Sequence, residues 1–337
     1  MQRVKCFICG QKKNKVLFEL KKSQQGETFQ IGECFVCGHV FMDPRPTTKE
    51  LVKYYAQDYH YDGDFYNEVF AKQALGFYNE IKSYLKPKST IIDIGCSKGY
   101  LLNFAKRAGH KVRGIEISSD AAIYVKKNFD IDVLVGPVEK QKIKAKSVDV
   151  ITAFDLIEHL PNPKKTISQM FEWLKPGGQM IIDTPNFDSI YRKISQDRWV
   201  GFDMPFHIHL FRKETLVRVL KEIGFSEVVV ETSHFNLFSR EGFVRSKAYG
   251  LLVLAVKFLR LSNMWERAQK HYLVQPVAHE NMKMNKSDEP AKESGYRDPK
   301  ISFIDILEAG INAPFNYYFG KKLLWGDGLR VIAKKPI

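Results

Sequence analysis

The chain has 337 residues, 44% apolar and 13% aromatic, and a formal net charge of +14. This composition supplies a hydrophobic core for one or two domains, and the charge is compatible with an anionic partner (nucleic acid, a nucleotide-linked sugar or a membrane surface) or with a solvated basic surface. The longest apolar run, residues 249–261, contains Lys257 and Arg260 and is shorter than the roughly 20 apolar residues of a membrane span, so we expect neither a transmembrane segment nor a secretory signal.

Two matching Cys-x-x-Cys-Gly sequences near the beginning of the chain predict a metal site. Each turn directs two thiolates at one ion, and the following glycine permits the tight turn. Four thiolates leave no open coordination position, so we expect a structural rather than catalytic Zn²⁺. Four unrelated buried cysteines are the alternative. The predicted ligands are Cys6, Cys9, Cys34 and Cys37.

The zinc site predicts a small ribbon over residues 1–42, with strands at 16–20 and 27–34. We favour a structural or docking role for it over nucleic-acid binding. Residues 43–88 follow as a helical linker, with helices expected at 50–55 and 64–85. The linker is rich in aromatic residues, which could form a lid over a cofactor cleft or pack against a sheet edge.

Residues 90–117 form the unit around which the remaining chain is organised. An apolar strand at 90–94 leads through small residues into a helix at 100–108. The next strand, 112–117, carries Glu116 near its end. Small residues allow close backbone approach to a ligand, the helix N-terminus offers free N–H groups, and the acid can accept both hydroxyls of a ribose. A glycine-rich turn without a ligand is the alternative.

Helices and strands alternate from there to residue 233. We expect strands at 133–135, 147–153, 179–184 and 227–232, helices at 120–128, 163–174 and 212–223, and a turn at the Lys-Pro-Gly-Gly sequence 175–178. Regular alternation predicts an α/β fold with a mostly parallel, doubly wound sheet, whose ligands bind at the carboxyl ends of the strands. Residues 93–99, Glu116 and residues 154–159 should therefore converge.

Five ordered segments resemble the class I S-adenosylmethionine (SAM) methyltransferases, in their ubiquinone-biosynthesis-like branch. The segments are DIGCSKG (93–99), GIEIS (114–118), VDVITAFDLIEHLPNP (148–163), LKPGGQMIIDTPN (174–186) and PFHIHLFRKETLVRVLKEIGF (205–225). The dinucleotide fingerprint would require glycine at positions 97 and 100, where Ser97 and Tyr100 stand. With the cysteine pairs, the chain is also similar to methyltransferases encoded with bacterial polysaccharide and sugar-modifying enzymes.

The resemblance implies a Rossmann-like seven-stranded methyltransferase sheet that binds SAM. It places the methionine moiety against the turn of residues 95–99, with Asp93 beneath, and the ribose hydroxyls on Glu116. Ile117 would contact the adenine, and residues 155 and 156 the methionine end. Whether Glu139 or a backbone group meets the adenine amine stays open. The implied cofactor-binding residues are Asp93, Gly95, Cys96, Ser97, Gly99, Glu116, Ile117, Asp155 and Leu156.

Methyl transfer from a sulfonium is an in-line displacement, so the protein mainly positions the nucleophile and excludes water. A hydroxyl nucleophile gains from a general base. His207 is the first candidate, His159 the second and His209 the third. The loop 185–212 also holds Arg192, Arg198 and Trp199 for an anionic or sugar acceptor, or it is a solvated charged loop.

Residues 326–337 supply the last strand, 329–335, and complete the SAM domain together with residues 89–233. The intervening residues 234–325 are an expected helical insertion, with a long helix at 242–269 and a polar, flexible loop at 277–300. This insertion could cover the site, form a dimer interface or contact a membrane surface peripherally. A helix that only packs on the core is the alternative.

We therefore expect a cytoplasmic or peripherally membrane-bound SAM-dependent methyltransferase. Its acceptor would be a sugar, a glycan or another small or carrier-linked intermediate of polysaccharide biosynthesis, with O-methylation favoured over C-methylation. An RNA methyltransferase is the alternative enzyme, although the Asn/Asp-Pro-Pro-aromatic motif of many base methyltransferases is missing after residue 153. A non-catalytic zinc-ribbon binding protein on the same scaffold is the alternative from another class. The oligomeric state stays open.

Overall fold

The computed structural model describes residues 1–21, 27–58, 64–199, 201–233 and 327–337. The expected insertion, with its helix, flexible loop and proposed membrane contact, lies outside the described residues, as do residues 59–63 of the aromatic stretch. Within the part described, no helix combines the length and the apolar character needed to cross a membrane.

The larger sheet has seven strands in the order β10-β11-β8-β7-β4-β5-β6. Strands β4 to β8 run parallel, and β11 is antiparallel to both of its neighbours. The doubly wound, Rossmann-like prediction is confirmed. The strands are β4 (Thr90–Ile94), β5 (Lys111–Glu116), β6 (Val133–Val135), β7 (Val148–Phe154), β8 (Leu174–Pro185), β10 (Glu227–Ser233) and β11 (Gly328–Lys334).

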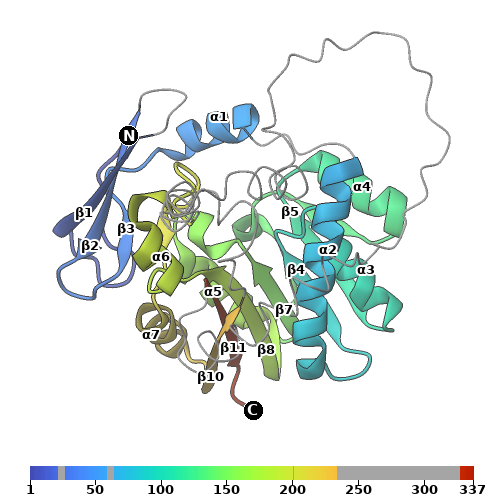
Figure 1. Ribbon diagram of the computed structural model, residues 1–337. Helices are drawn as coiled ribbons and strands as arrows, with labels where there is room; N and C mark the ends of the chain where they lie inside the picture. Colours follow the sequence, from blue (N-terminus) through green and yellow to red (C-terminus); the bar gives the residue numbers. More distant parts are fainter. Residues whose placement is uncertain (22–26, 59–63, 200, 234–326) are drawn as a thin grey trace, which may run out of the picture.

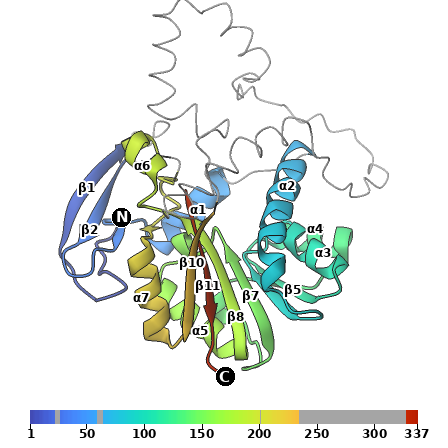
Figure 2. The same cartoon turned by 60° about the horizontal axis from the view of Figure 1, so that its bottom comes forward.

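Helices cover both faces of this sheet (Figures 1 and 2). Alternate residues along β4 explain the two layers, since Ile91 belongs to the buried cluster that includes α2 and α3 side chains, whereas Ile92 belongs to the cluster that includes α5 and α7 side chains. The helices are α1 (Thr48–Asp58), α2 (Asp64–Ile81), α3 (Tyr100–Arg107), α4 (Ser119–Phe129), α5 (Pro163–Trp173), α6 (Ile190–Ser195) and α7 (Lys213–Ile223). Short 3₁₀ helices are η1 (Lys82–Tyr84), η2 (Val138–Lys140), η3 (Ile157–His159) and η4 (Gln196–Arg198).

A second sheet of four strands, in the order β1-β2-β3-β9, holds the N-terminal region. Three strands come from the expected ribbon: β1 (Asn14–Lys21), β2 (Thr28–Cys34) and β3 (Val40–Met42). The fourth, β9 (His209–Leu210), comes from the loop after β8 and pairs antiparallel with β3. In both views this sheet lies on the same side of the molecule as α6 and α7, away from α2 to α4. This four-stranded sheet is therefore built partly from the loop expected to face the acceptor.

One predicted turn differs. The Lys-Pro-Gly-Gly sequence 175–178 is part of β8, which begins at Leu174. Gly177 takes a positive φ of 72° there, and the pairing of β7 with β8 shifts between Val148 and Val150. The sequence predicts a turn here because glycine with a positive φ is typical of both a turn and a β-bulge, and the structure has the bulge. The other predicted boundaries in the sheet agree to within one or two residues.

Candidate functional site

The turn between β4 and α3 is held in a conformation that exposes its backbone at the carboxyl end of the sheet. Gly95 (φ 72°) and Gly99 (φ 71°) lie in the left-handed region, and so does Ser97 at 46°. A Cβ at Gly99 would approach Val125 Cγ2 to 2.7 Å, so a side chain there would require α4 to move. The N–H of Gly95 bonds to the carbonyl of Ile115 at 2.8 Å, which fixes the turn against β5.

Glu116 lies directly beside this turn at the end of β5. Its carboxylate accepts from the backbone N–H groups of Ser97 (2.8 Å), Ile117 (2.8 Å) and Ser118 (3.0 Å). These three donors fix the carboxylate at the mouth of the turn. Glu116, predicted to bind the ribose, and the turn of residues 95–99, predicted to bind the methionine moiety, therefore lie next to each other.

Asp93 and Cys96 face inward from the same turn. Asp93 is buried and accepts from Thr152 Oγ1 at 2.6 Å. Burial, with the nearby Glu116 carboxylate, raises the pKa of Asp93 to about 7. Cys96 Sγ lies 2.5 Å from where a Cβ of Gly114 would stand. The Cys96 thiol therefore packs in the core, its pKa raised by burial, and only its backbone can face a ligand.

Two apolar side chains line the turn. Ile117 is 70% exposed at the tip of β5, and Leu156 lies 3.2 Å from the position of a Gly95 Cβ. Asp155 has a positive φ of 46° and an exposed side chain at the carboxyl end of β7. The Glu139 carboxylate, an open candidate for the adenine amine, is already held by another residue, since its Oε1 accepts from Thr166 Oγ1 at 2.6 Å.

The two histidines that are the first candidates for the general base lie side by side just beyond Leu156. The rings of His159 and His207 are 4.7 Å apart in an edge-to-face arrangement. His207 Nδ1 lies 2.9 Å from the Gly201 carbonyl, and because a carbonyl only accepts, Nδ1 carries the proton. In the neutral ring, Nε2 then bears the lone pair that a general base requires. Burial next to His207 lowers the pKa of His159 well below its usual value, so that ring is neutral.

Three other residues of the loop after β8 make structural contacts: His209, Trp199 and Arg192. His209 is buried and contacts His39 in the smaller sheet. Trp199 is buried, and its Nε1 donates to Asp327 at 2.9 Å. Arg192 donates to the Phe187 carbonyl at 2.7 Å. These contacts contradict the expectation that Trp199 meets a sugar acceptor.

Glu158 adds a buried carboxylate beneath the two histidines. It is 1% exposed, its Oε2 accepts from Thr184 Oγ1 at 2.9 Å, and its Oε1 has no partner among the described residues. Burial raises the pKa of this carboxyl well above its usual value. Glu158, His159 and His207 have ligand atoms within 4.8 Å of one another, so the three could hold a cation.

The four predicted zinc ligands form one cluster. Their sulfur atoms lie within 4.8 Å of one another, with 3.4 Å between Cys6 and Cys37 and between Cys9 and Cys34. Backbone N–H groups of the knuckles also point at the thiols, as those of Ile8 and Cys9 do at Cys6. This donor set and spacing fit a tetrahedral ion.

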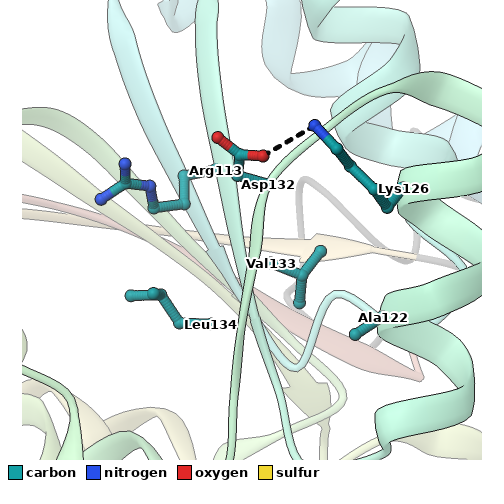
Figure 3. Close-up of a pocket in the computed structure, with 6 residues that line it drawn as sticks. All are labelled: Arg113, Ala122, Lys126, Asp132, Val133 and Leu134. Atoms are coloured by element: carbon teal, nitrogen blue, oxygen red, sulfur yellow. Dashed lines mark hydrogen bonds and ion pairs between the residues drawn. The ribbon is translucent and has the colours of Figure 1, made fainter.

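A cavity of about 460 Å³ lies beside α4, against the neighbouring strands β5 and β6, and Figure 3 shows the residues that line it. It is lined by Arg113, Ala122, Lys126, Asp132, Val133 and Leu134. Lys126 and Asp132 pair across it at 3.0 Å. No residue of the turn or of the histidine pair lines this cavity, so it is separate from the candidate site.

Comparisons with known proteins agree with this geometry. Residues 66–231 match the family described as a methyltransferase domain. Residues 66–231 are therefore similar to a methyltransferase domain. A Mycolicibacterium smegmatis protein named "Probable S-adenosylmethionine-dependent methyltransferase" is 26% identical over 136 residues, which are 40% of this chain and 51% of that protein. The ubiquinone biosynthesis O-methyltransferase of Nitrosococcus oceani is 35% identical over 102 residues, 28% of this chain and 43% of that protein.

The chain thus spans about half the length of the curated relatives it matches. Among solved structures, a SAM-dependent methyltransferase from Archaeoglobus fulgidus aligns with a TM-score of 0.47 and 17% identity, covering 80% of this chain and 100% of that one.

Four contributors to the domain's site were missed by sequence reasoning: Thr152, Thr184, His39 and Arg45. The two threonines lie on β7 and β8 and bond to Asp93 and Glu158. A polar residue inside an otherwise apolar strand is the signal that could have found them. His39 and Arg45 contact His209 from the N-terminal region. No local sequence pattern predicts these two contacts, because the partners lie far apart in the chain.

Proposed function

We propose that this protein transfers the methyl group of SAM to a sugar, a glycan or another small or carrier-linked acceptor, with a hydroxyl oxygen as first choice and carbon as second. The observation that carries the proposal is that residues 156–159 connect the cofactor turn directly to the two histidines. Leu156 lines the cofactor turn, and His159, one 3₁₀ turn further on, meets His207. Three residues of 3₁₀ helix span roughly 6 Å, so the imidazoles lie about one helical turn from the side chain that lines the cofactor turn.

Asp93, the turn of residues 95–99 and Glu116 would bind the cofactor through its methionine and ribose groups. The acceptor oxygen would attack the methyl carbon as the sulfonium bond breaks, and His207 Nε2 would take the hydroxyl proton. For carbon methylation the same nitrogen would remove a proton next to a carbonyl group. The protein's contribution is position and exclusion of water.

The choice of acceptor is supported by two features of the chain. Its net charge of +14 suits a nucleotide-linked or carrier-linked substrate that carries phosphate. Its cysteine pairs followed by DPRPT are similar to those of enzymes from polysaccharide and sugar-modification clusters.

The test has two stages. Titration calorimetry with SAM should give a micromolar Kd that Glu116→Ala weakens, and a mass-gain screen over nucleotide sugars and glycans should identify the methylated product. A folded protein that takes no SAM would refute the enzyme assignment and favour the non-catalytic binding protein.

We further propose that the four cysteines hold one structural Zn²⁺. Elemental analysis should find one zinc per chain, and Cys34→Ser should lower that content and the melting temperature together. Full metal retention in a Cys6→Ser, Cys34→Ser double variant would contradict this assignment.

RNA methylation is the second candidate, favoured by a cationic groove. This groove, about 360 Å³, opens at the amino ends of β4, β5 and β7, and its lining includes Lys111, Arg113, Lys142 and Lys144 but no acid. It lies at the opposite edge of the sheet from the cofactor turn, which is why we rank it second. Binding of a short RNA that weakens steeply between low and moderate salt, and is lost when these four are neutralised, would promote it.

A further inference from the structure

The segment that carries His207 is clamped by the N-terminal cysteine module, residues 1–42. Strand β9 follows His207 by two residues and pairs with β3, with Phe41 opposite His209. The N–H of Met42 donates to the Ile208 carbonyl at 3.1 Å, and the N–H of Ile208 donates to the Glu158 carbonyl at 3.0 Å. The backbone next to His207 therefore bridges the cysteine module and the segment of His159.

Buried side chains reinforce this bridge. His209 Nδ1 lies 3.1 Å from His39 Nε2, and Arg45 Nη1 lies 3.4 Å from His209 Nε2. A guanidinium only donates, so His209 Nε2 accepts from Arg45 and its Nδ1–H donates to His39. Arg45 also donates to the Pro161 carbonyl at 3.0 Å, which ties the segment just after His159 to the same cluster.

The cysteine knuckles contact this cluster directly. Phe7, between Cys6 and Ile8, packs edge-on against His39 (4.8 Å) and His209 (4.7 Å). Glu33, which precedes Cys34, pairs with Arg212 at 2.9 Å at the end of the same loop. Both knuckles thus hold the loop, one through an aromatic ring and the other through an ion pair.

We infer that the cysteine module positions the acceptor side of the site, and that His209 and His39 are positioning residues which act through His207. The inference rests on the proposed function, because His207 matters to turnover only if the acceptor binds beside it. The position of His207 matters because a general base must lie within hydrogen-bond reach of the acceptor proton. A displacement of the base by about 1 Å lowers the rate up to 100-fold.

The test compares His209→Leu with His209→Asn in the full-length, metal-loaded chain, without any acceptor. Asn can still donate to His39, whereas Leu fills a similar volume without a donor. We expect His209→Leu to shift the His207 ring resonances in NMR spectra and to make amide exchange at residues 207–211 and 157–160 about tenfold faster. Asn should restore both, while exchange at residues 91–116 and SAM affinity stay unchanged in either variant.

Two further variants keep the test decisive if His209→Leu does not fold. Glu33→Gln removes the half-buried ion pair with Arg212 and should shift the same resonances by a smaller amount, whereas Glu19→Gln, at an exposed position of β1, should not. Unchanged His207 signals in His209→Leu and Glu33→Gln, or equal shifts for Leu and Asn, would overturn the inference. Failure of the proposed function is read separately, as absent SAM binding in the wild-type chain.

Discussion

The cofactor side of the site lies mostly in one stretch, residues 93–118, with residues 155 and 156 beside it, whereas the acceptor side joins residues 158–159, 207–209 and 39–45. The first is made mostly of backbone: a left-handed turn, N–H groups and one carboxylate that the N–H groups hold. The second is made of side chains from three separate segments that meet through β3 and β9. Substitutions on the cofactor side should therefore change SAM affinity alone, and those on the acceptor side should change turnover alone.

The largest expected effect is that of His207→Gln on turnover. A general base contributes about 10²–10⁴-fold to rate, so kcat with the acceptor found by mass gain should fall by that range. SAM affinity in calorimetry should stay within about twofold, because His207 lies beyond the cofactor turn. His110→Gln, remote from both halves, is the matched control. A loss of SAM binding in His207→Gln would break the division between the two halves.

Glu116→Ala should have the next largest effect, on the other half. It removes the ribose acceptors and leaves three backbone donors without the carboxylate. Charged hydrogen bonds contribute about 1.5–3 kcal/mol, so the Kd for SAM should rise about 100-fold. Glu139→Ala is the matched control, since Thr166 already holds that carboxylate. Equal losses in the two variants would show that Glu139 also meets the cofactor.

The fold could be predicted closely because buried parallel strands appear as apolar runs between glycine-rich turns. Thr90–Ile94 and Val133–Val135 agree at both ends. The two-residue strand β9 could not be predicted, since its partner Val40–Met42 lies more than 160 residues earlier and two residues carry no periodicity. The Gly177 bulge was mistaken for a turn because both need a positive φ.

The two halves of the site differ in predictability for the same reason. On the cofactor side, spacing alone places the turn and Glu116 together, because a strand, a helix and a strand enforce that geometry. On the acceptor side, spacing indicates histidines but not which one faces the cofactor. His209 stands two residues after His207, yet it points at His39, and only the long-range pairing of β3 with β9 decides that.

A third, smaller effect concerns pH. The pKa of Asp93 is raised to about 7 in the folded chain, and the cationic sulfonium and ammonium of SAM would favour its ionised form. If only that form binds well, affinity should be about tenfold higher at pH 8 than at pH 6 and should level off above pH 8. Calorimetry in two buffers should detect a proton released on binding, and Asp93→Asn should abolish both effects.

The same shift has a consequence for stability. An unfolded Asp titrates near pH 3.9, so between about pH 4 and pH 7 the folded chain holds a proton that the unfolded chain has lost. The contribution of Asp93 to the free energy of unfolding therefore falls as the pH rises through that window and is constant above it. Urea denaturation of wild type and Asp93→Asn across pH 5–8 would measure it, and parallel curves would contradict the buried, proton-binding carboxyl.

The smallest expected effect is also the cleanest test of the cofactor half. Ile117 is 70% exposed at the tip of β5, and Ile123 on α4 is 65% exposed. If Ile117 covers one face of the adenine, Ile117→Ser should cost about 1 kcal/mol of binding, a roughly fivefold rise in Kd for SAM. Ile123→Ser removes the same side chain at similar exposure outside the turn and should change the Kd by less than about 1.5-fold. Since neither side chain has a structural role in the core, the two variants should melt alike, and equal Kd values would remove the adenine contact from the cofactor half.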